Sequence, residues 1–492
     1  MKKLFTLVLA CVMSLAAMAE NYRCKLAVDV YGEPSDPMEI DLECTENANG
    51  KYDILLKDFA FGGMPVGNVN VKDINAETED GVTYLTFDGT ITLEGAFAAF
   101  GAIPTTLEGN LLGDLLAIHL QVPDLGVNVA LTNEVTQIYG SDFENWHKAG
   151  TSDEPNGWHG IKSGTGLASF AGASAFISDD VPGDSKGEKS VKLQSGVTFG
   201  ISANGTITTG RMAVGAMEAA STKNNVFVDP SSKDVDGNGD PFYNTFHGRP
   251  TSITLWYKFK NGGDNTNPAL LSANLIGEGK FQEPAPEGTT FENLIANATS
   301  TLETTDKWTM VTVPFDYTSY NAEDIDPASI LVTINTCSVP GGGSKSSDDP
   351  DVLYVDDVQL NYAPVATSMS IFDQEVEGFS ADKTEYDITL PEIPTDDDID
   401  FECANGELAA ALIHYEKTNN TLVVNMYSQE LKYLKTYTFH VTIDTAVKGI
   451  TSDAANRTVT GRYNANGQKV GNNAKGLVIT RFADGTAVKS MK

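Results

Sequence analysis

Residues 252–260 read SITLWYKFK, and this short stretch decides the fold class. Its apolar residues are Ile253, Leu255, Tyr257 and Phe259, and they alternate with Thr254, Trp256 and Lys258. Side chains of a β-strand point alternately to opposite faces, so this alternation indicates a strand with one buried face. We expect the first set to face a core and the second set to face outward.

The same period of two recurs along the chain, between turns rich in Gly, Asn, Ser and Asp. Further predicted strands lie at residues 22–30, 38–44, 52–56, 69–74, 85–93, 116–122, 125–131, 308–315, 330–336 and 352–362. Many short strands separated by polar loops are typical of sandwiches and barrels. The sequence therefore predicts an all-β protein of several domains, in which the outward side chains and the loops carry the function.

The N-terminus has the pattern of a secretory signal peptide. Two lysines precede an apolar run from Leu4 to Ala16, and residues 17–19 form a small-residue cleavage site ending at Ala19. Lipidation at Cys11 is the alternative. No later stretch reaches about 18 consecutive apolar residues, so no membrane span is predicted. We expect a secreted or outer-surface protein, with the periplasm as a further possible location.

The chain is strongly acidic, with 67 Asp and Glu residues against 33 Lys and Arg residues and a net charge of −34. Such a field repels phosphate backbones and anionic lipid headgroups, which excludes nucleic acid and bilayer surfaces as favoured partners. It favours calcium, whose ligands are oxygens. Solubility alone is the alternative explanation, and the sequence identifies no protein partner.

Residues 22–44 predict an antiparallel hairpin with one buried face. If Val30 lies opposite Met38, the same register places Cys24 opposite Cys44. Disulfides form in oxidising compartments, so we expect a cross-strand disulfide between these two cysteines. The alternative is a pair of buried free thiols.

Three segments carry a resemblance for the first domain, residues 21–134. They are YDILLKDF at 52–59, GMPVGNVNV at 63–71 and LAIHLQVPDLGVNVAL at 116–131. On these the domain resembles the calycin-like domains of secreted Bacteroidetes proteins. The resemblance implies a lipocalin-like β-barrel that holds one small apolar ligand. The alternative is a barrel filled by its own side chains.

A second resemblance spans residues 141–362. It rests on FENW at 143–146, FHGRPTSITLWYKF at 246–259, DKWTMVTVPFDY at 306–317 and LYVDDVQLNY at 353–362. The segment resembles a domain class associated with carbohydrate metabolism in gut and oral Bacteroidetes, itself similar to jelly-roll carbohydrate-binding modules. The resemblance implies a jelly-roll β-sandwich that binds carbohydrate.

The third domain, residues 366–445, contains VEGFSADKTEYDITLPEIP at 376–394 and LKTYTFHVTI at 434–443. It resembles the small Ig-like or cadherin-like sandwiches that follow such modules. The tail, residues 451–492, carries two hairpin-turn dipeptides, Asn466-Gly467 and Asp484-Gly485, between short alternating strands. It resembles the C-terminal sorting signals of type IX secretion, although it is shorter and more basic.

The outward-facing side chains of the predicted strand at residues 252–260 are the candidate glycan contacts. An indole on the outer face of a sandwich sheet can stack on the apolar face of a pyranose ring. Trp256, with Thr254 and Lys258 beside it, is therefore the predicted glycan-binding site. The alternative is an indole covered by a neighbouring loop, because Trp is highly buried on average.

Two groups of acids are candidate calcium ligands. One loop matches the first half of an EF-hand, with oxygens at Asp234, Asp236, Asn238 and Asp240, but the twelfth position is Thr245 rather than a glutamate. The resemblance to jelly rolls implies a structural calcium at Asp356 and Asp357. The alternative for the loop is a polar turn.

Catalytic motifs are absent from the sequence: it contains no nucleophile elbow, HExxH helix, CxxC pair, P-loop or dinucleotide fingerprint. No catalytic residue is predicted. The leading hypothesis is a non-catalytic protein that binds glycan through the central domain. The alternatives are a structural or adhesive surface protein and a glycoside hydrolase acting through acids of the central domain.

Overall fold

The computed structural model describes residues 20–79, 81–150, 152–320, 325–395, 398–443, 459–464, 477–482 and 487–491. The predicted signal peptide and Cys11 lie outside these residues. The chain divides into two compact units, residues 1–387 with 394–440 and residues 388–393 with 441–492. Regular structure in the described residues is β-strand apart from four short 3₁₀ helices, so the predicted all-β class is confirmed. No described helix is long and apolar enough to cross a bilayer.

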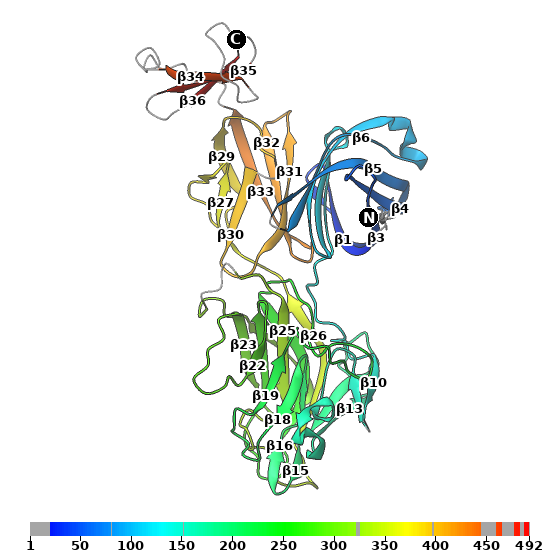
Figure 1. Ribbon diagram of the computed structural model, residues 1–492, viewed down its shortest axis with the longest axis vertical. Coiled ribbons are helices and arrows are strands. Elements are labelled where there is room, and N and C mark those ends of the chain that lie inside the picture. Colours follow the sequence, from blue (N-terminus) through cyan, green and yellow to red (C-terminus); the bar gives the residue numbers. More distant parts are fainter. Residues whose placement is uncertain are drawn as a thin grey trace, which may run out of the picture. The chain divides into compact units, whose positions relative to one another are not determined.

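The N-terminal domain is a closed β-barrel (Figure 1). Successive strands pair antiparallel, and β1 also pairs with β9, placing Val28 opposite Val129 and closing the cylinder. Eight long strands form the wall, and the two-residue β2 extends one edge. The strands are β1 (Glu20–Val30), β2 (Glu33–Pro34), β3 (Met38–Glu46), β4 (Tyr52–Phe61), β5 (Met64–Glu79), β6 (Val82–Thr92), β7 (Ala102–Leu112), β8 (Leu115–Val122) and β9 (Val127–Thr132).

The barrel interior is occupied by the apolar half of these strands. Ile74, Leu85, Leu107 and Leu116 are at most 2% exposed and belong to one cluster to which all eight wall strands contribute. Alternation explains this, because every second residue of a barrel strand faces inward. The interior is thus lined by the protein's own side chains, and a small apolar ligand within it stays a prediction.

The predicted disulfide between Cys24 and Cys44 is wrong, because the hairpin register differs by four residues. Leu26 rather than Val30 lies opposite Met38, so Cys24 faces Ile40 and Cys44 faces Glu20. The last two residues of β1 instead pair with β2 around a tight turn. The cysteines are therefore about 13 Å apart along the strands, whereas a disulfide needs Cα atoms within about 7 Å. Both thiols are free, and burial raises their pKa to about 12.

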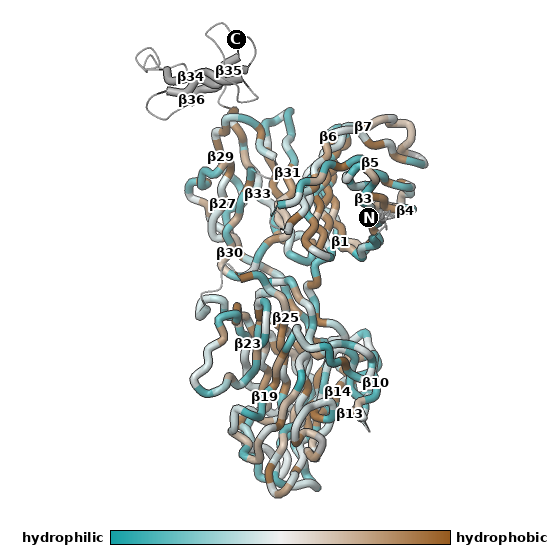
Figure 2. The backbone as a smooth tube through the Cα atoms, viewed as in Figure 1, coloured by the Kyte–Doolittle hydropathy of each residue, from teal (hydrophilic) through white to brown (hydrophobic). Residues whose placement is uncertain are grey.

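The central domain is a β-sandwich. One sheet has the order β13-β14-β26-β20-β24 and the other has the order β17-β25-β21-β23. Their inner faces share the largest core cluster, which includes Ile253, Leu255, Phe259 and Val355. In Figure 2 hydrophobic residues are concentrated in the strands of this domain, for example around β19 and β25. The strands are β13 (Ser174–Ser178), β14 (Ser190–Gln194), β17 (Thr206–Thr208), β20 (Ser252–Lys260), β21 (Ala269–Ile276), β23 (Leu294–Leu302), β24 (Thr305–Pro314), β25 (Ser329–Asn335) and β26 (Val352–Asn361).

A third, smaller sheet of the order β12-β18-β19-β22 covers the second sheet from outside. Met212 and Phe281 of this sheet pack with Ile276 and Leu331 of the second sheet. The second sheet is therefore apolar on both faces at this point. The remaining strands of the domain are β10 (Trp146–Ala149), β11 (Ser152–Pro155), β12 (Thr165–Gly166), β15 (Gly196–Thr198), β16 (Ile201–Ala203), β18 (Arg211–Val214), β19 (Asn224–Val228) and β22 (Phe281–Glu283).

The third domain has two small sheets, of the orders β28-β27-β30 and β29-β33-β32-β31. Aromatic rings lie between them, where Phe379 contacts Tyr386, Phe401 and Tyr437. Its strands are β27 (Ala366–Ile371), β28 (Gln374–Glu375), β29 (Glu385–Leu390), β30 (Ile399–Cys403), β31 (Leu408–Glu416), β32 (Thr421–Ser428) and β33 (Tyr433–Ile443).

The tail contains one antiparallel sheet of β34 (Val459–Asn464), β35 (Leu477–Phe482) and β36 (Ala487–Met491). The two predicted turn dipeptides lie outside the described residues. Its proposed role as a sorting signal stays a prediction.

Candidate functional site

Strand β20 (Ser252–Lys260) has the predicted alternation of buried and outward-facing side chains. Ile253 and Leu255 are fully buried in the core, while Thr254, Trp256 and Lys258 lie on the outer face and are half-exposed. The three predicted glycan-binding side chains are thus brought to one face of one sheet. Each nevertheless has its own neighbours there.

Lys258 lies in a row of side chains that crosses the outer face. Its ammonium is 4.5 Å from the ring centre of Tyr354 and 5.5 Å from that of Trp308, and it also forms an ion pair with Asp180. Trp308 donates its indole N–H to Asp180 at 2.9 Å. The hydrogen bond from Lys258 holds the pKa of Asp180 below its usual range. The amine of Lys258 is therefore engaged within the protein.

The side chain of Trp256 is only partly exposed to solvent. It lies between Met310 of β24, which is 55% exposed, and Asp356 of β26, which is fully buried. Thr254 accepts a hydrogen bond from the amide of Asn361 at 2.7 Å. Only part of the indole face is accessible, so this site offers a smaller stacking surface than the sequence predicted.

A groove on the other side of the sandwich, which the sequence analysis missed, is the stronger candidate. Its cavity of about 400 Å³ lies where the third sheet meets the second sheet. Large apolar side chains stand exposed at its mouth: Phe170 is 63% exposed, Phe199 is 76% exposed and Met217 is 50% exposed. Exposed aromatic rings around a concavity are typical of a ligand site.

The floor of this groove is polar. Thr206 donates a 2.6 Å hydrogen bond to the amide oxygen of Asn335, and Ser272 donates to the carboxylate of Glu283 at 2.8 Å. Ser202, which is 3% exposed, also lines the groove, and its hydroxyl has no hydrogen-bond partner. The groove therefore combines an apolar mouth with hydrogen-bonding groups beneath it.

The groove was missed because its lining comes from five separate stretches of sequence. They lie at residues 161–171, 198–226, 270–284, 333–335 and 337–341. Neither alternation nor motif spacing connects them. The available signal was the pair of phenylalanines, Phe170 and Phe199, placed in Gly- and Ser-rich segments where no core strand is expected.

The EF-hand-like loop uses its oxygens for contacts within the protein. Asp236 is fully buried, and one of its carboxylate oxygens lies 3.3 Å from Nε2 of both His147 and His159. Asp234 forms a 2.6 Å ion pair with Arg211. The other oxygen of Asp236 accepts hydrogen bonds from the backbone N–H groups of Asn238 and Asp240.

Burial alone would raise the pKa of Asp236. The hydrogen bond from His159, the two backbone donors and the charge of His147 outweigh it and hold this pKa at about 2. Calcium at this loop stays a prediction. Asp234 and Asp236 already have partners on other segments, and Asn238 donates to Asp240 within the loop.

Asp356 and Asp357 occupy a bulge in β26. Asp356 is fully buried, and its Oδ2 has no hydrogen-bond partner. Burial, the neighbouring Asp357 and the charge of Glu144 raise the pKa of Asp356 to about 7. Among the described residues no group of three or more His, Cys, Asp or Glu side chains is arranged to hold a metal ion. A cation here would need backbone carbonyl or water ligands in addition.

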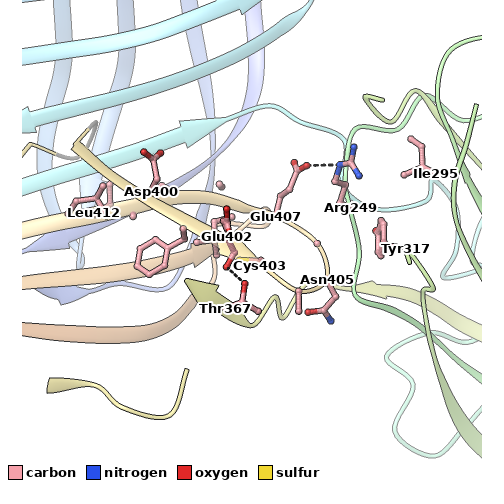
Figure 3. A pocket seen from close by; sticks show the side chains of 18 of the residues that line it. Arg249, Ile295, Tyr317, Thr367, Asp400, Glu402, Cys403, Asn405, Glu407 and Leu412 are labelled. Atoms are coloured by element: carbon pink, nitrogen blue, oxygen red, sulfur yellow. Dashed lines mark hydrogen bonds and ion pairs between the residues drawn. The ribbon is translucent and has the colours of Figure 1, made fainter. Parts of the chain in front are cut away.

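A further cavity, of about 1020 Å³, is shown in Figure 3. It is lined by residues that include Arg249, Tyr317, Glu402 and Glu407. Arg249 donates to Glu407 at 2.6 Å and to the carbonyl of Ile325 at 2.6 Å. Its guanidinium therefore holds loops together within this cavity.

Comparison with known families identifies the first domain. Residues 18–136 match the family model of the calycin-like β-barrel domain. This confirms the calycin-like part of the resemblance that the sequence motifs suggested, and the Bacteroidetes origin stays a prediction. No curated protein matches the chain.

Solved structures with some likeness are distant. The enzymatically active domain of bacteriophage CBA120 tailspike protein 4 is 13% identical, with a TM-score of 0.23, and the match covers 45% of this chain and 20% of that one. A carbohydrate-binding module of the β-sandwich superfamily is 12% identical (TM-score 0.22), covering 69% and 99%. The tandem CBM22 domain of Paenibacillus barcinonensis Xyn10C is 12% identical (TM-score 0.21), covering 70% and 74%.

These scores are too low for the likeness to bear on function. The family match and the closed topology agree for the first domain alone: residues 18–136 are a calycin-like β-barrel domain.

Proposed function

We propose that this protein is a non-catalytic, secreted or surface-exposed protein that binds glycan in the groove of its central sandwich. The supporting observation is the exposed pair Phe170 and Phe199 above a floor of hydroxyl, amide and carboxylate groups. A pyranose ring presents an apolar face of C–H groups and an edge of hydroxyls. The aromatic rings at the mouth of the groove can stack on the apolar face of the sugar, and the polar floor can form hydrogen bonds with its hydroxyls.

The outer sheet face with Trp256, Thr254 and Lys258 is a second, weaker contact zone in this proposal. Its cation and its acid are already paired with each other, so a ligand gains less by approaching them. The groove has exposed rings and an unpartnered buried hydroxyl, Ser202. We therefore assign glycan binding first to the groove.

Calorimetric titration of the mature chain with a panel of oligosaccharides tests the assignment. The double variant Phe170→Ala/Phe199→Ala is expected to lose at least about fivefold in affinity, because each ring stack contributes about 0.5–1.5 kcal/mol. Trp256→Ala is the matched control and is expected to change affinity less than about threefold. The reverse order would move the site to the outer sheet face.

Structural calcium at Asp356 is part of the same proposal. The fully buried Oδ2 without a partner and the nearby Asp357 and Glu144 support it. Calcium would offset the repulsion among these acids. The melting temperature of the wild type is expected to rise by a few degrees on adding calcium and to stay constant in Asp356→Asn. Asp236→Asn should keep the response, since its loop lies elsewhere.

One observation favours glycoside hydrolysis as a second candidate function, with acids that lie outside the central domain in which the sequence analysis expected them. Glu134 and Glu407 line a common cavity of about 460 Å³. Burial, followed by the charge of Glu407, raises the pKa of Glu134 to about 7, and burial also raises the pKa of Glu407. A proton-bearing acid beside a second carboxylate is what glycosidases use. Release of reducing sugar that disappears in Glu134→Gln would establish this activity.

A further inference from the structure

The groove carries charge of only one sign. Of the described residues that line it, Glu283 alone has a charged side chain, and no Lys, Arg or His is among them. The other polar groups are hydroxyls and amides, such as those of Thr206, Ser202 and Asn335. The groove therefore places a single carboxylate in surroundings that are otherwise neutral and mostly apolar.

Glu283 is held in place by a chain of buried neutral donors. Ser272 donates to both carboxylate oxygens, at 3.1 Å and 2.8 Å, and Asn274 donates to Oε2 at 3.0 Å. Asn274 in turn accepts a 2.7 Å hydrogen bond from Asn297. Ser272 is 2% exposed and Asn274 is 3% exposed, so the two donors that fix the carboxylate are themselves immobile. These contacts orient the carboxylate.

Neutral donors orient a carboxylate without cancelling its charge. Among the described residues no ion pair involves Glu283. A carboxylate accepts hydrogen bonds at about four lone-pair sites, so a donor from a ligand still has room at Oε1. A charged donor forms a hydrogen bond about twice as strong as a neutral one. An anionic ligand meets repulsion instead.

We propose that the groove selects sugars with a free amino group, such as a glucosamine residue of a glycan. The ammonium would bind Glu283, and the rings of Phe170 and Phe199 would contact the sugar face. Aromatic faces also attract cations, which strengthens the same preference. This inference rests on the proposed glycan binding and names its substrate class.

The test uses three oligosaccharides of equal length, namely deacetylated chitosan, fully N-acetylated chitin and polygalacturonate. Their affinities for the mature full-length chain are measured by calorimetry at moderate salt. We expect the deacetylated oligomer to bind at least about tenfold more tightly than the acetylated one, and the uronate to bind more weakly than either. The preference should shrink when the pH is raised until the ligand amine is neutral.

Glu283→Gln separates the groove from the general acidity of the chain. It should remove most of the tenfold preference for the deacetylated over the acetylated oligomer, and the readout is the ratio of the two affinities in each variant. Glu287→Gln, an exposed acid on the following loop, changes the net charge equally and should leave the preference intact.

The outcomes distinguish two failures. If none of the three sugars binds but another oligosaccharide of the panel does, glycan binding stands and the amino-sugar preference is overturned; if no oligosaccharide of the panel binds, the proposed glycan function itself is wrong. If acetylated and deacetylated oligomers bind equally, or if Glu283→Gln and Glu287→Gln behave alike, glycan binding stands and the amino-sugar preference is overturned. An unchanged melting temperature shows that Glu283→Gln is folded.

Discussion

Asp236 and Asp356 are aspartates of the central sandwich whose side chains are both buried, yet their pKa values are shifted in opposite directions. Asp236 has a pKa of about 2, and Asp356 has a pKa of about 7. Desolvation by burial, which raises the pKa, is the largest single contribution at both sites. The difference lies in the partners. Asp236 faces two imidazoles and two backbone N–H groups, whereas Asp356 accepts one backbone N–H, from Asp357, and faces the carboxylates of Asp357 and Glu144.

The comparison shows why a carboxylate-rich sequence pattern does not by itself define a cation site. Both aspartates were predicted calcium ligands. The protein supplies its own partners to the carboxylate of Asp236, namely two imidazoles and two backbone N–H groups. At Asp356 one oxygen has no partner, and additional positive charge or a proton would be stabilising. Substitutions at Asp236, at Asp356 and at their neighbours test whether the different partners explain the different pKa values.

The largest expected effect is the pH dependence that Asp356 imposes on stability. Its pKa rises from about 3.9 in the unfolded chain to about 7 in the folded protein, so the folded state holds the proton more tightly. Stability therefore falls as the pH rises through this window, by as much as about 4 kcal/mol. Asp356→Asn cannot ionise and should be more stable than the wild type above pH 7, with little difference below about pH 4.

Chemical denaturation with a calcium chelator present measures this effect. All four tryptophans (Trp146, Trp158, Trp256 and Trp308) lie in the central domain, so their fluorescence follows its unfolding selectively. Asp357→Asn is the control, since that side chain is half-exposed, and its effect should be smaller. Equal stability of the wild type and Asp356→Asn at alkaline pH would contradict the prediction.

The next effect is the loss of the anion at Asp236. Asp236→Asn keeps the size of the side chain but removes the charge that His147 and His159 both face. Breaking a buried ion pair on one side costs about 3 kcal/mol, so the unfolding midpoint in denaturant should drop markedly at neutral pH. The two aspartates are thus expected to respond to the same substitution with opposite signs. If Asp236→Asn were more stable than the wild type, both aspartates would respond with the same sign, and the prediction would be wrong.

The sequence was sufficient to predict which side chains of β20 are buried, but not which distant segments contact the loop of Asp236. Alternation placed Leu255 in the core and Trp256 outside because it depends only on neighbouring residues. The loop containing Asp236 was found by its spacing, but its partners His147 and His159 lie nearly 80 or more positions earlier, and no spacing connects them to the loop. No local sequence pattern indicates that the segments of His147, His159 and Asp236 lie together in the fold.

Local geometry also limited the barrel prediction. The hairpin at residues 22–44 was correctly predicted as antiparallel, but the short strand β2 takes up the end of β1 and shifts the register. That shift separates Cys24 from Cys44. The pattern of apolar residues is satisfied equally by both registers, because they differ by an even number of residues.

Acid titration gives a smaller effect at the same loop. The depressed pKa of Asp236 contributes stability that is fully present above the unfolded value of about 3.9 and is lost as the pH falls toward 2. The loss amounts to about 2 kcal/mol. The difference in stability between the wild type and Asp236→Asn should therefore narrow below pH 4. A gap that stayed constant down to pH 2 would show that Asp236 does not titrate in this range.

Asp234 provides the smallest effect and the strictest comparison, because it lies two residues from Asp236 and carries the same charge. Its side chain is 66% exposed, and its partner Arg211 also contacts the ring of Phe242 at 4.3 Å. An exposed ion pair contributes about 0.5 kcal/mol, and Arg211 keeps the aromatic contact without it. Asp234→Asn should therefore shift the free energy of unfolding by no more than this amount, and less at high salt. A loss as large as that of Asp236→Asn would mean that charge in the loop, rather than burial against the imidazoles, stabilises this region.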